Sequence, residues 1–108
     1  MNWIPLTTEA QLDEIIDMSA SKPTLIFKHS TRCSISSTAL NRLERAWGST
    51  QTSAYYLDLI AYRPISGLIA EKFNVEHQSP QVLVINQGKC SYSATHLDIS
   101  MDEIKLHL

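Results

Sequence analysis

Apolar residues recur along the chain with two different spacings, which predict alternating helices and strands. In four segments the apolar residues lie three and four positions apart, as on one face of a helix. In four others they form short runs bounded by turn residues, which is typical of strands. The predicted helices are residues 8–19, 34–47, 63–73 and a short one after Ser100, and the predicted strands are residues 24–29, 54–60, 81–86 and 90–96.

Sequence signals mark the start of three of these helices. Thr8 with Gln11, and Ser100 with Glu103, have the spacing of capping boxes. Proline is favoured in the first turn of a helix, so Pro64 indicates where the third helix begins.

The order of the elements predicts an α/β fold. A helix separates the first two strands, so a crossover joins them and they pair in parallel. A tight turn at residues 86–89 joins the last two strands, which are therefore antiparallel. We expect a four-stranded mixed sheet with helices on both faces, and the 108 residues have the size of a single domain, residues 1–108.

Composition and charge exclude several classes of function. The net charge is −2 and no lysine or arginine cluster is present, which argues against nucleic acid or an anionic membrane as the main partner. The N-terminal residues lack the basic start and apolar core of a signal peptide, and the longest aliphatic runs are too short to cross a bilayer. We therefore expect a cytoplasmic protein whose two cysteines are reduced.

Cys33 is the main candidate for chemistry. It lies between a predicted strand and a predicted helix, where unpaired backbone N–H groups and the helix dipole favour negative charge. These features favour the thiolate, the form that attacks disulfides. The neighbouring residues are polar, which argues against a buried structural cysteine, and Arg32 is a positive charge beside it.

Ser36 stands one helical turn after Cys33, where a redox protein often has a second cysteine. Its hydroxyl could hydrogen-bond the thiolate but cannot form a disulfide, so the second thiol would come from outside. Ser36 could equally be an ordinary early-helix serine. Cys90 follows the far turn of the last hairpin, about 20 Å of extended chain before His96, and we expect it to be structural.

Three histidines and one arginine are further candidates. His29 ends the first predicted strand, His77 precedes a proline, and His96 closes the last strand, so all three could lie near the cysteine. Each could stabilise a thiolate or contact a substrate, or could be a partly buried histidine bonded to the backbone. Arg63 could bind a carboxylate of a small thiol, or could pair with Asp58.

The sequence also resembles the YtxJ family, the monothiol bacilliredoxins, which have a thioredoxin-like fold. The resemblance rests on "FKHSTRCSIS", "YYLDLIAYRPISGLIAEKFNVEHQSPQVLVINQGK" and "SATH", which occur in order between Phe27 and His96. Ser34 is a departure, because the family commonly has proline at this position. Serine there leaves the start of the helix less stiff and alters the surroundings of a thiolate.

The resemblance implies a thiol-disulfide oxidoreductase. Family members are thought to remove bacillithiol, a low-molecular-weight thiol, from protein mixed disulfides, and Cys33 matches their active cysteine. A cis peptide bond between Ser79 and Pro80 is also implied, with Ser79 offering backbone groups to an extended substrate. The catalytic residues are then Cys33 and Ser36, and the expected substrate contacts are Ser79, Pro80, Arg32, His29 and His77.

The expected partners are S-thiolated proteins and a low-molecular-weight thiol such as bacillithiol, which is a co-substrate rather than a bound cofactor. We expect no metal, and a monomer or weak dimer. Two other functions fit the same residues. Cys33 with His29 and His77 could bind a metal, or an iron–sulfur cluster shared between two subunits. The second alternative is a binding module that has the same fold but no catalytic turnover, because fold does not settle function.

Overall fold

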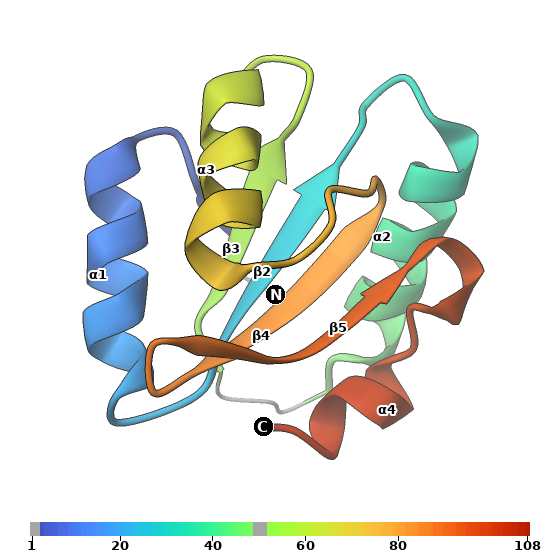
Figure 1. Cartoon of the computed structure of the whole chain (residues 1–108). Coiled ribbons are helices and arrows are strands. Elements are labelled where there is room, and N and C mark those ends of the chain that lie inside the picture. The colour runs from blue at the N-terminus through green and yellow to red at the C-terminus, as the bar shows by residue number, and fades with distance from the viewer. Residues whose placement is uncertain (1–2, 49–51) are drawn as a thin grey trace.

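A five-stranded sheet forms the centre of the computed structural model, which describes residues 3–48 and 52–108 (Figure 1). The strand order is β1-β3-β2-β4-β5. The first three strands are parallel, β4 is antiparallel to β2, and β5 is antiparallel to β4. The strands are β1 (Trp3–Pro5), β2 (Thr24–His29), β3 (Ala54–Asp58), β4 (Gln81–Asn86) and β5 (Lys89–Thr95).

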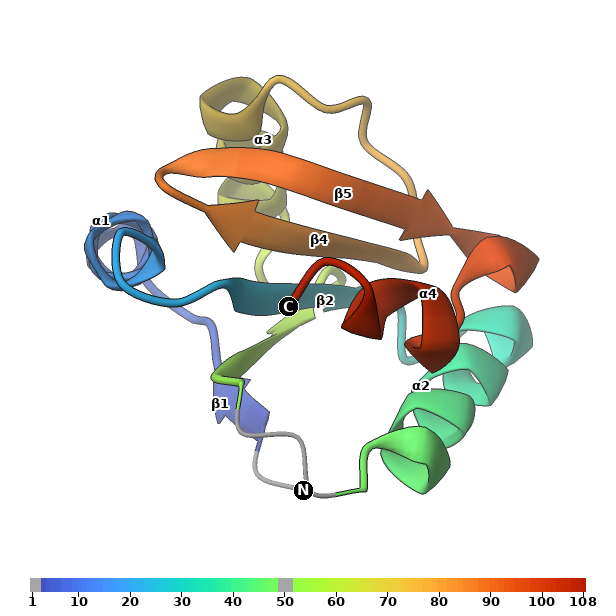
Figure 2. The same cartoon turned by 90° about the horizontal axis from the view of Figure 1, so that it is seen from below.

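Helices cover both faces of this sheet. Figure 2 shows α1 and α3 on one side and α2 and α4 on the other. Among the described residues, no helix has the length and apolar character that crossing a membrane requires. The helices are α1 (Glu9–Ser19), α2 (Ser34–Ala46), α3 (Arg63–Phe73), the 3₁₀ helix η1 (His96–Asp98) and α4 (Met101–Lys105).

Each face of the sheet has its own hydrophobic core. All six residues of β2 are buried, and successive side chains point to opposite faces, as in any strand. Leu25 and Phe27 pack under α2 and α4, whereas Ile26 packs under α1 and α3. Because β2 is central, the two polar residues that end it, Lys28 and His29, are also buried, one on each face.

The predicted α/β fold with a mixed sheet is confirmed, with one strand more than expected. The additional strand, β1, is an edge strand of three residues that ends in Pro5, and so short a segment has no strand pattern in the sequence. The capping box at Thr8 and Gln11 is confirmed. The one predicted at Ser100 is wrong, because the Ser100 side chain makes no cap hydrogen bond.

Candidate functional site

Cys33 lies between β2 and α2 and is the N-cap residue of α2, with extended backbone angles of φ −110° and ψ 121°. Its N–H donates to the Ser30 carbonyl at 3.1 Å, and its carbonyl accepts from the Ser37 N–H at 3.1 Å. The residue is half-buried, and its sulfur has no hydrogen-bond partner within the described part of the chain. Cys33 therefore lies at the positive end of the helix dipole, and part of the residue is exposed to solvent.

Ser36 is fully buried, and its hydroxyl connects the end of β2 to the first turn of α2. The Ser36 Oγ accepts a hydrogen bond from the Ser30 N–H at 3.0 Å and lies 2.7 Å from the His29 Nδ1. The expected hydrogen bond from Ser36 to the Cys33 sulfur is not among those of the described residues, because these two partners hold the hydroxyl. Ser36 thus fixes the loop that carries Cys33.

His29 is 4% exposed and packs between aromatic rings on the α2 side of the sheet. The ring centroids of Phe27 and Tyr56 lie 5.8 Å and 5.4 Å from that of His29. Burial lowers the pKa of His29, and the negative charge of Asp58 partly opposes this shift. The imidazole is therefore neutral at neutral pH, and it contacts Ser36 rather than solvent.

This neutral, buried histidine predicts a loss of stability at mildly acid pH. Unfolded His29 takes up a proton near its ordinary pKa of about 6.5, whereas folded His29 does so at lower pH. The unfolded state binds more protons in this window, so the free energy of unfolding falls as the pH falls from neutral through the ordinary histidine pKa of about 6.5. In urea titrations across this range, we expect a smaller fall for His29→Gln.

His77→Gln is the matched control, because the pKa of the exposed His77 is also lowered. Its pH dependence should stay closer to that of the wild type, since the more deeply buried His29 remains in place. Identical pH dependence in the wild type and His29→Gln would show that His29 does not titrate as its burial requires.

A second polar cluster lies on the α3 face of β2. Lys28 is fully buried; its Nζ donates to the Ser66 carbonyl at 3.4 Å and lies 3.3 Å from the His77 Nδ1. The Ser66 Oγ lies 3.0 Å from the same nitrogen. Burial lowers the pKa of Lys28 to about 8. The pKa of His77 is lowered first by burial and then by the positive charges of Lys28 and Arg63.

Lys28 and Ser66 are not among the candidates that the sequence suggests. The available signal is the lysine itself, in the strand "TLIFKH" whose other residues before the terminal histidine are apolar or threonine. A charged side chain in a central strand is rarely fully buried without a partner. The partners of Lys28 are distant in sequence, so the cluster becomes visible only in the folded chain.

The loop before β4 reaches the same end of the sheet. The Ser79–Pro80 peptide bond is cis, as the resemblance implies. Gln81 follows it and pairs with Lys28 of β2, and the Pro80 carbonyl accepts a hydrogen bond from the His96 N–H at 3.0 Å. The Ser79 Oγ is buried without a hydrogen-bond partner in the described part of the chain.

The candidate residues gather where β2 and β3 end and α2 and α3 begin, at the top of Figure 1. The Leu59 N–H donates to the His29 carbonyl at 2.9 Å, which holds the segment before α3 against the end of β2. Arg32 and Arg63 are both exposed at this end, beside Cys33 and at the start of α3, and the His96 side chain is exposed. Among the described residues, no three His, Cys, Asp or Glu side chains are grouped as metal ligands.

Cys90 lies at the opposite end of the sheet. Cys90 pairs with Ile85, and Ile85 pairs with Thr24, the first residue of β2. Cys33 lies beyond the other end of β2, which is His29. The five residue steps of β2 span about 17 Å. A disulfide allows a Cα separation of at most about 7 Å, so Cys33 and Cys90 cannot pair in this fold.

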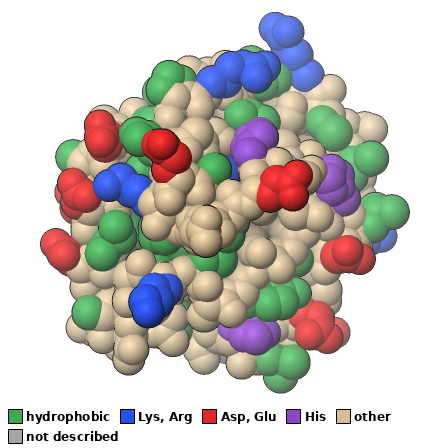
Figure 3. Space-filling model, in the orientation of Figure 1, with side chains coloured by type: hydrophobic (Ala, Val, Ile, Leu, Met, Phe, Trp, Pro, Cys, Tyr) green, Lys and Arg blue, Asp and Glu red, His purple; other side chains and the backbone are tan. Residues whose placement is uncertain are grey.

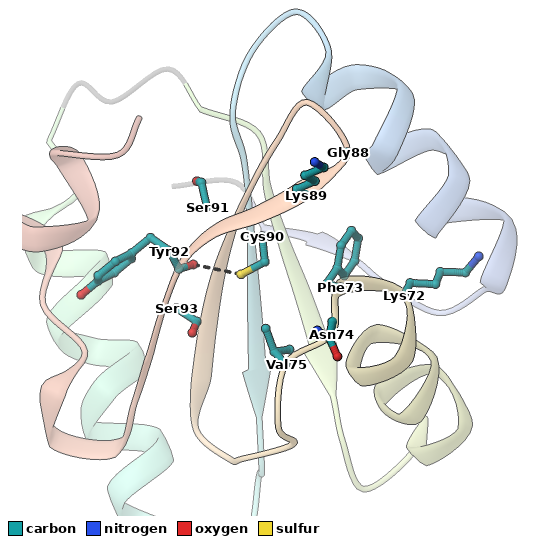
Figure 4. A pocket seen from close by; sticks show the side chains of 10 residues that line it. All are labelled: Lys72, Phe73, Asn74, Val75, Gly88, Lys89, Cys90, Ser91, Tyr92 and Ser93. Atoms are coloured by element: carbon teal, nitrogen blue, oxygen red, sulfur yellow. Dashed lines mark hydrogen bonds between the residues drawn. The ribbon is translucent and has the colours of Figure 1, made fainter.

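Figure 4 shows the surroundings of Cys90, whose sulfur borders a cavity of about 520 Å³ between β5 and the turn after α3. The Cys90 Sγ donates to the Tyr92 carbonyl at 3.3 Å. Burial raises the pKa of Cys90, so this residue remains a thiol at neutral pH. Cys90 is therefore both distant from Cys33 and poorly suited to attack a disulfide.

Comparisons with solved structures define the class of this protein. A structure described as having a thioredoxin fold matches with a TM-score of 0.85 and 29% identity, over 95% of this chain and 90% of that chain. Reduced Schistosoma mansoni thioredoxin matches with a TM-score of 0.74 and 15% identity, over 99% and 97% of the two chains. Trypanosoma brucei brucei thioredoxin matches with a TM-score of 0.75 and 19% identity, over 98% of this chain and 88% of that chain. The fold and the cysteine at the start of α2 define a thioredoxin-fold redox protein.

The family can be stated more narrowly. The family model described as monothiol bacilliredoxin BrxC matches residues 4–104. The chain belongs to the monothiol bacilliredoxin family, and the resemblance to the YtxJ-type proteins is confirmed. Membership supports a redox enzyme that acts on protein or small-molecule thiols.

Proposed function

We propose that the protein removes bacillithiol, or a similar low-molecular-weight thiol, from protein mixed disulfides, with Cys33 as the nucleophile. The position of Cys33 carries this proposal. The residue is half-buried, lies at the start of α2, and its sulfur has no hydrogen bond to another described residue. Ser36 takes the place of a second cysteine, and Cys90 lies too far away to form an internal disulfide.

The reaction proceeds in two exchanges. The Cys33 thiolate attacks the small-thiol sulfur, a new S–S bond forms, and the protein sulfur leaves with the electron pair of the broken bond and takes up a proton. A second small-thiol thiolate then attacks the adduct on Cys33. This step yields the disulfide of the small thiol and returns the Cys33 thiolate, so both exchanges conserve electrons.

Some of the surrounding residues supply positive charge, and others hold the loop of Cys33 or the substrate in position. The N-terminal end of α2 supplies positive charge at Cys33, and the neighbouring residue, Arg32, is an exposed cation. Ser36 holds the loop to β2 through Ser30 and His29. The backbone of Ser79 and the ring of Pro80 provide the edge along which an extended mixed disulfide lies.

Intact mass after exposure to bacillithiol disulfide tests this proposal. Reduced wild-type protein should gain one bacillithiol, and fresh bacillithiol should remove it. Cys33→Ser should gain none, whereas Cys90→Ser should behave as the wild type because Cys90 is a partly buried thiol of raised pKa. Glutathione disulfide, used in parallel, shows which small thiol is preferred.

Two results would overturn the proposed function. One is the absence of any adduct on Cys33. The other is the loss of two hydrogens in a product that requires both cysteines, since this would be an internal dithiol reaction. The strand register separates Cys33 from Cys90, and we expect neither result.

A further inference from the structure

A small cavity lies beside the cis-proline loop, on the α3 face of the sheet. It has a volume of about 210 Å³ and is lined by Leu59, Arg63, Ser66, Gly67 and His77. The first turn of α3 supplies Arg63 and Ser66, and the segment that leads to Pro80 supplies His77. The cavity is thus at the Cys33 end of the sheet but on the face opposite His29 and Ser36.

The residues that line this cavity include an arginine and a histidine but no carboxylate. Arg63 is part of the lining, and Lys28 contacts two other lining residues, Ser66 and His77. Neither Lys28 nor Arg63 forms an ion pair in the part of the chain that the structure describes. Figure 3 shows basic side chains at the upper edge of the molecule, a histidine below them, and an acidic side chain beside that histidine. A buried ammonium without a counter-ion is costly, which points to a ligand of opposite charge.

The hydrogen bonds fix which groups the cavity presents. An ammonium group has donors only, so in the tautomer that hydrogen-bonds Lys28 the His77 Nδ1 is the acceptor. The proton of the neutral imidazole is then on Nε2, which is a donor. The His77 Nε2–H and the Arg63 guanidinium are then both donors, and such a pair suits an anion.

We propose that this cavity binds a carboxylate of the low-molecular-weight thiol while its sulfur reacts with Cys33. This inference rests on the proposed function and deepens it by naming the chemistry of the small thiol. A guanidinium binds a carboxylate through two parallel hydrogen bonds, which fixes its orientation. His77 is three residues before Pro80, a span of at most about 10 Å, so a thiol of tripeptide size reaches from the cis-proline loop into the cavity.

The test compares two probes that differ only in their carboxylates, glutathione disulfide and its ethyl ester. The rate of adduct formation on Cys33 is measured with each by intact mass, and the ratio of acid to ester rates is the readout. We expect Arg63→Gln to lower this ratio about tenfold, which corresponds to about 1.4 kcal/mol. Arg63→Lys should retain part of the preference, because the charge remains.

The control is Arg42→Gln, which removes an exposed positive charge from α2. Its ratio should equal that of the wild type, which separates a binding site from general attraction by net charge. Equal ratios in the wild type and Arg63→Gln would overturn the carboxylate site while leaving single-thiol exchange intact. A wild-type Cys33 that reacts with neither probe nor with bacillithiol disulfide would overturn the proposed function as well.

Discussion

Replacement of Lys28 by methionine is expected to raise the free energy of unfolding by about 3 kcal/mol near pH 7. The Lys28 side chain is fully buried, and its contacts are a carbonyl and an imidazole rather than a carboxylate. Burial lowers its pKa from 10.5 to about 8, and each unit of this shift costs about 1.4 kcal/mol when the amine is charged. Methionine has a similar length and flexibility but no charge to desolvate.

The dependence of this gain on pH distinguishes it from a packing effect. Between about pH 8 and about pH 10.5, folded Lys28 is neutral while unfolded Lys28 remains protonated. The unfolded state binds more protons there, so wild-type stability rises with pH and the advantage of Lys28→Met shrinks. Urea titrations near pH 7 and near pH 10 measure this change.

Lys105→Met is the matched control, because Lys105 is exposed on α4 and its replacement should leave stability nearly unchanged. If Lys28→Met proved no more stable than the wild type near pH 7, the buried amine would not carry the cost that its position indicates. The same variant should lose part of the preference for carboxylate probes, since Lys28 supports the cationic cavity. If Lys28→Met both gained stability and lost the preference for carboxylate probes, the role of Lys28 in binding would explain why an unpaired lysine occupies a central strand.

The elements of the fold follow from the sequence where hydrophobic spacing is strong. The run "TLIFKH" predicts β2, and the turn after "QVLVIN" predicts the β4–β5 hairpin, as the structure shows. β1 has no such pattern because an edge strand of three residues needs no long apolar run. Its existence depends on pairing with β3, which only the folded chain provides.

The site is predictable from the sequence only where it depends on local structure. The place of Cys33 between a strand and a helix follows from short-range patterns, and so does the distance of Cys90 beyond the far turn. The partners of Ser36 do not follow, since the strand must end beside the helix before His29 can reach the hydroxyl. The contact between Lys28 and His77 joins residues 49 apart, and no local pattern encodes it.

A cysteine in place of Ser36 is expected to let the protein remove its own Cys33 adduct. Cys33 is the N-cap of α2 and Ser36 the third helical residue, so the two residues stand one helical turn apart, on neighbouring positions of the helix surface. In Ser36→Cys the second attack becomes intramolecular, so we expect the adduct lifetime without added thiol to fall at least about 100-fold. A time course of intact mass should show loss of the small thiol and formation of an internal disulfide, whereas the wild-type adduct persists.

Two further variants test whether release of the adduct from Cys33 requires a thiol at position 36 or only a thiol somewhere in the protein. Ser37→Cys places a thiol one residue later on an exposed position, and its adduct should persist because the side chain turns away from Cys33. Cys90→Ser combined with Ser36→Cys should react as Ser36→Cys alone, since Cys90 lies at the other end of the sheet. A persistent adduct in Ser36→Cys would mean that the contacts with Ser30 and His29 hold the side chain at position 36 away from the reacting sulfur. Rapid release would show that only the missing sulfur makes this site depend on an outside thiol.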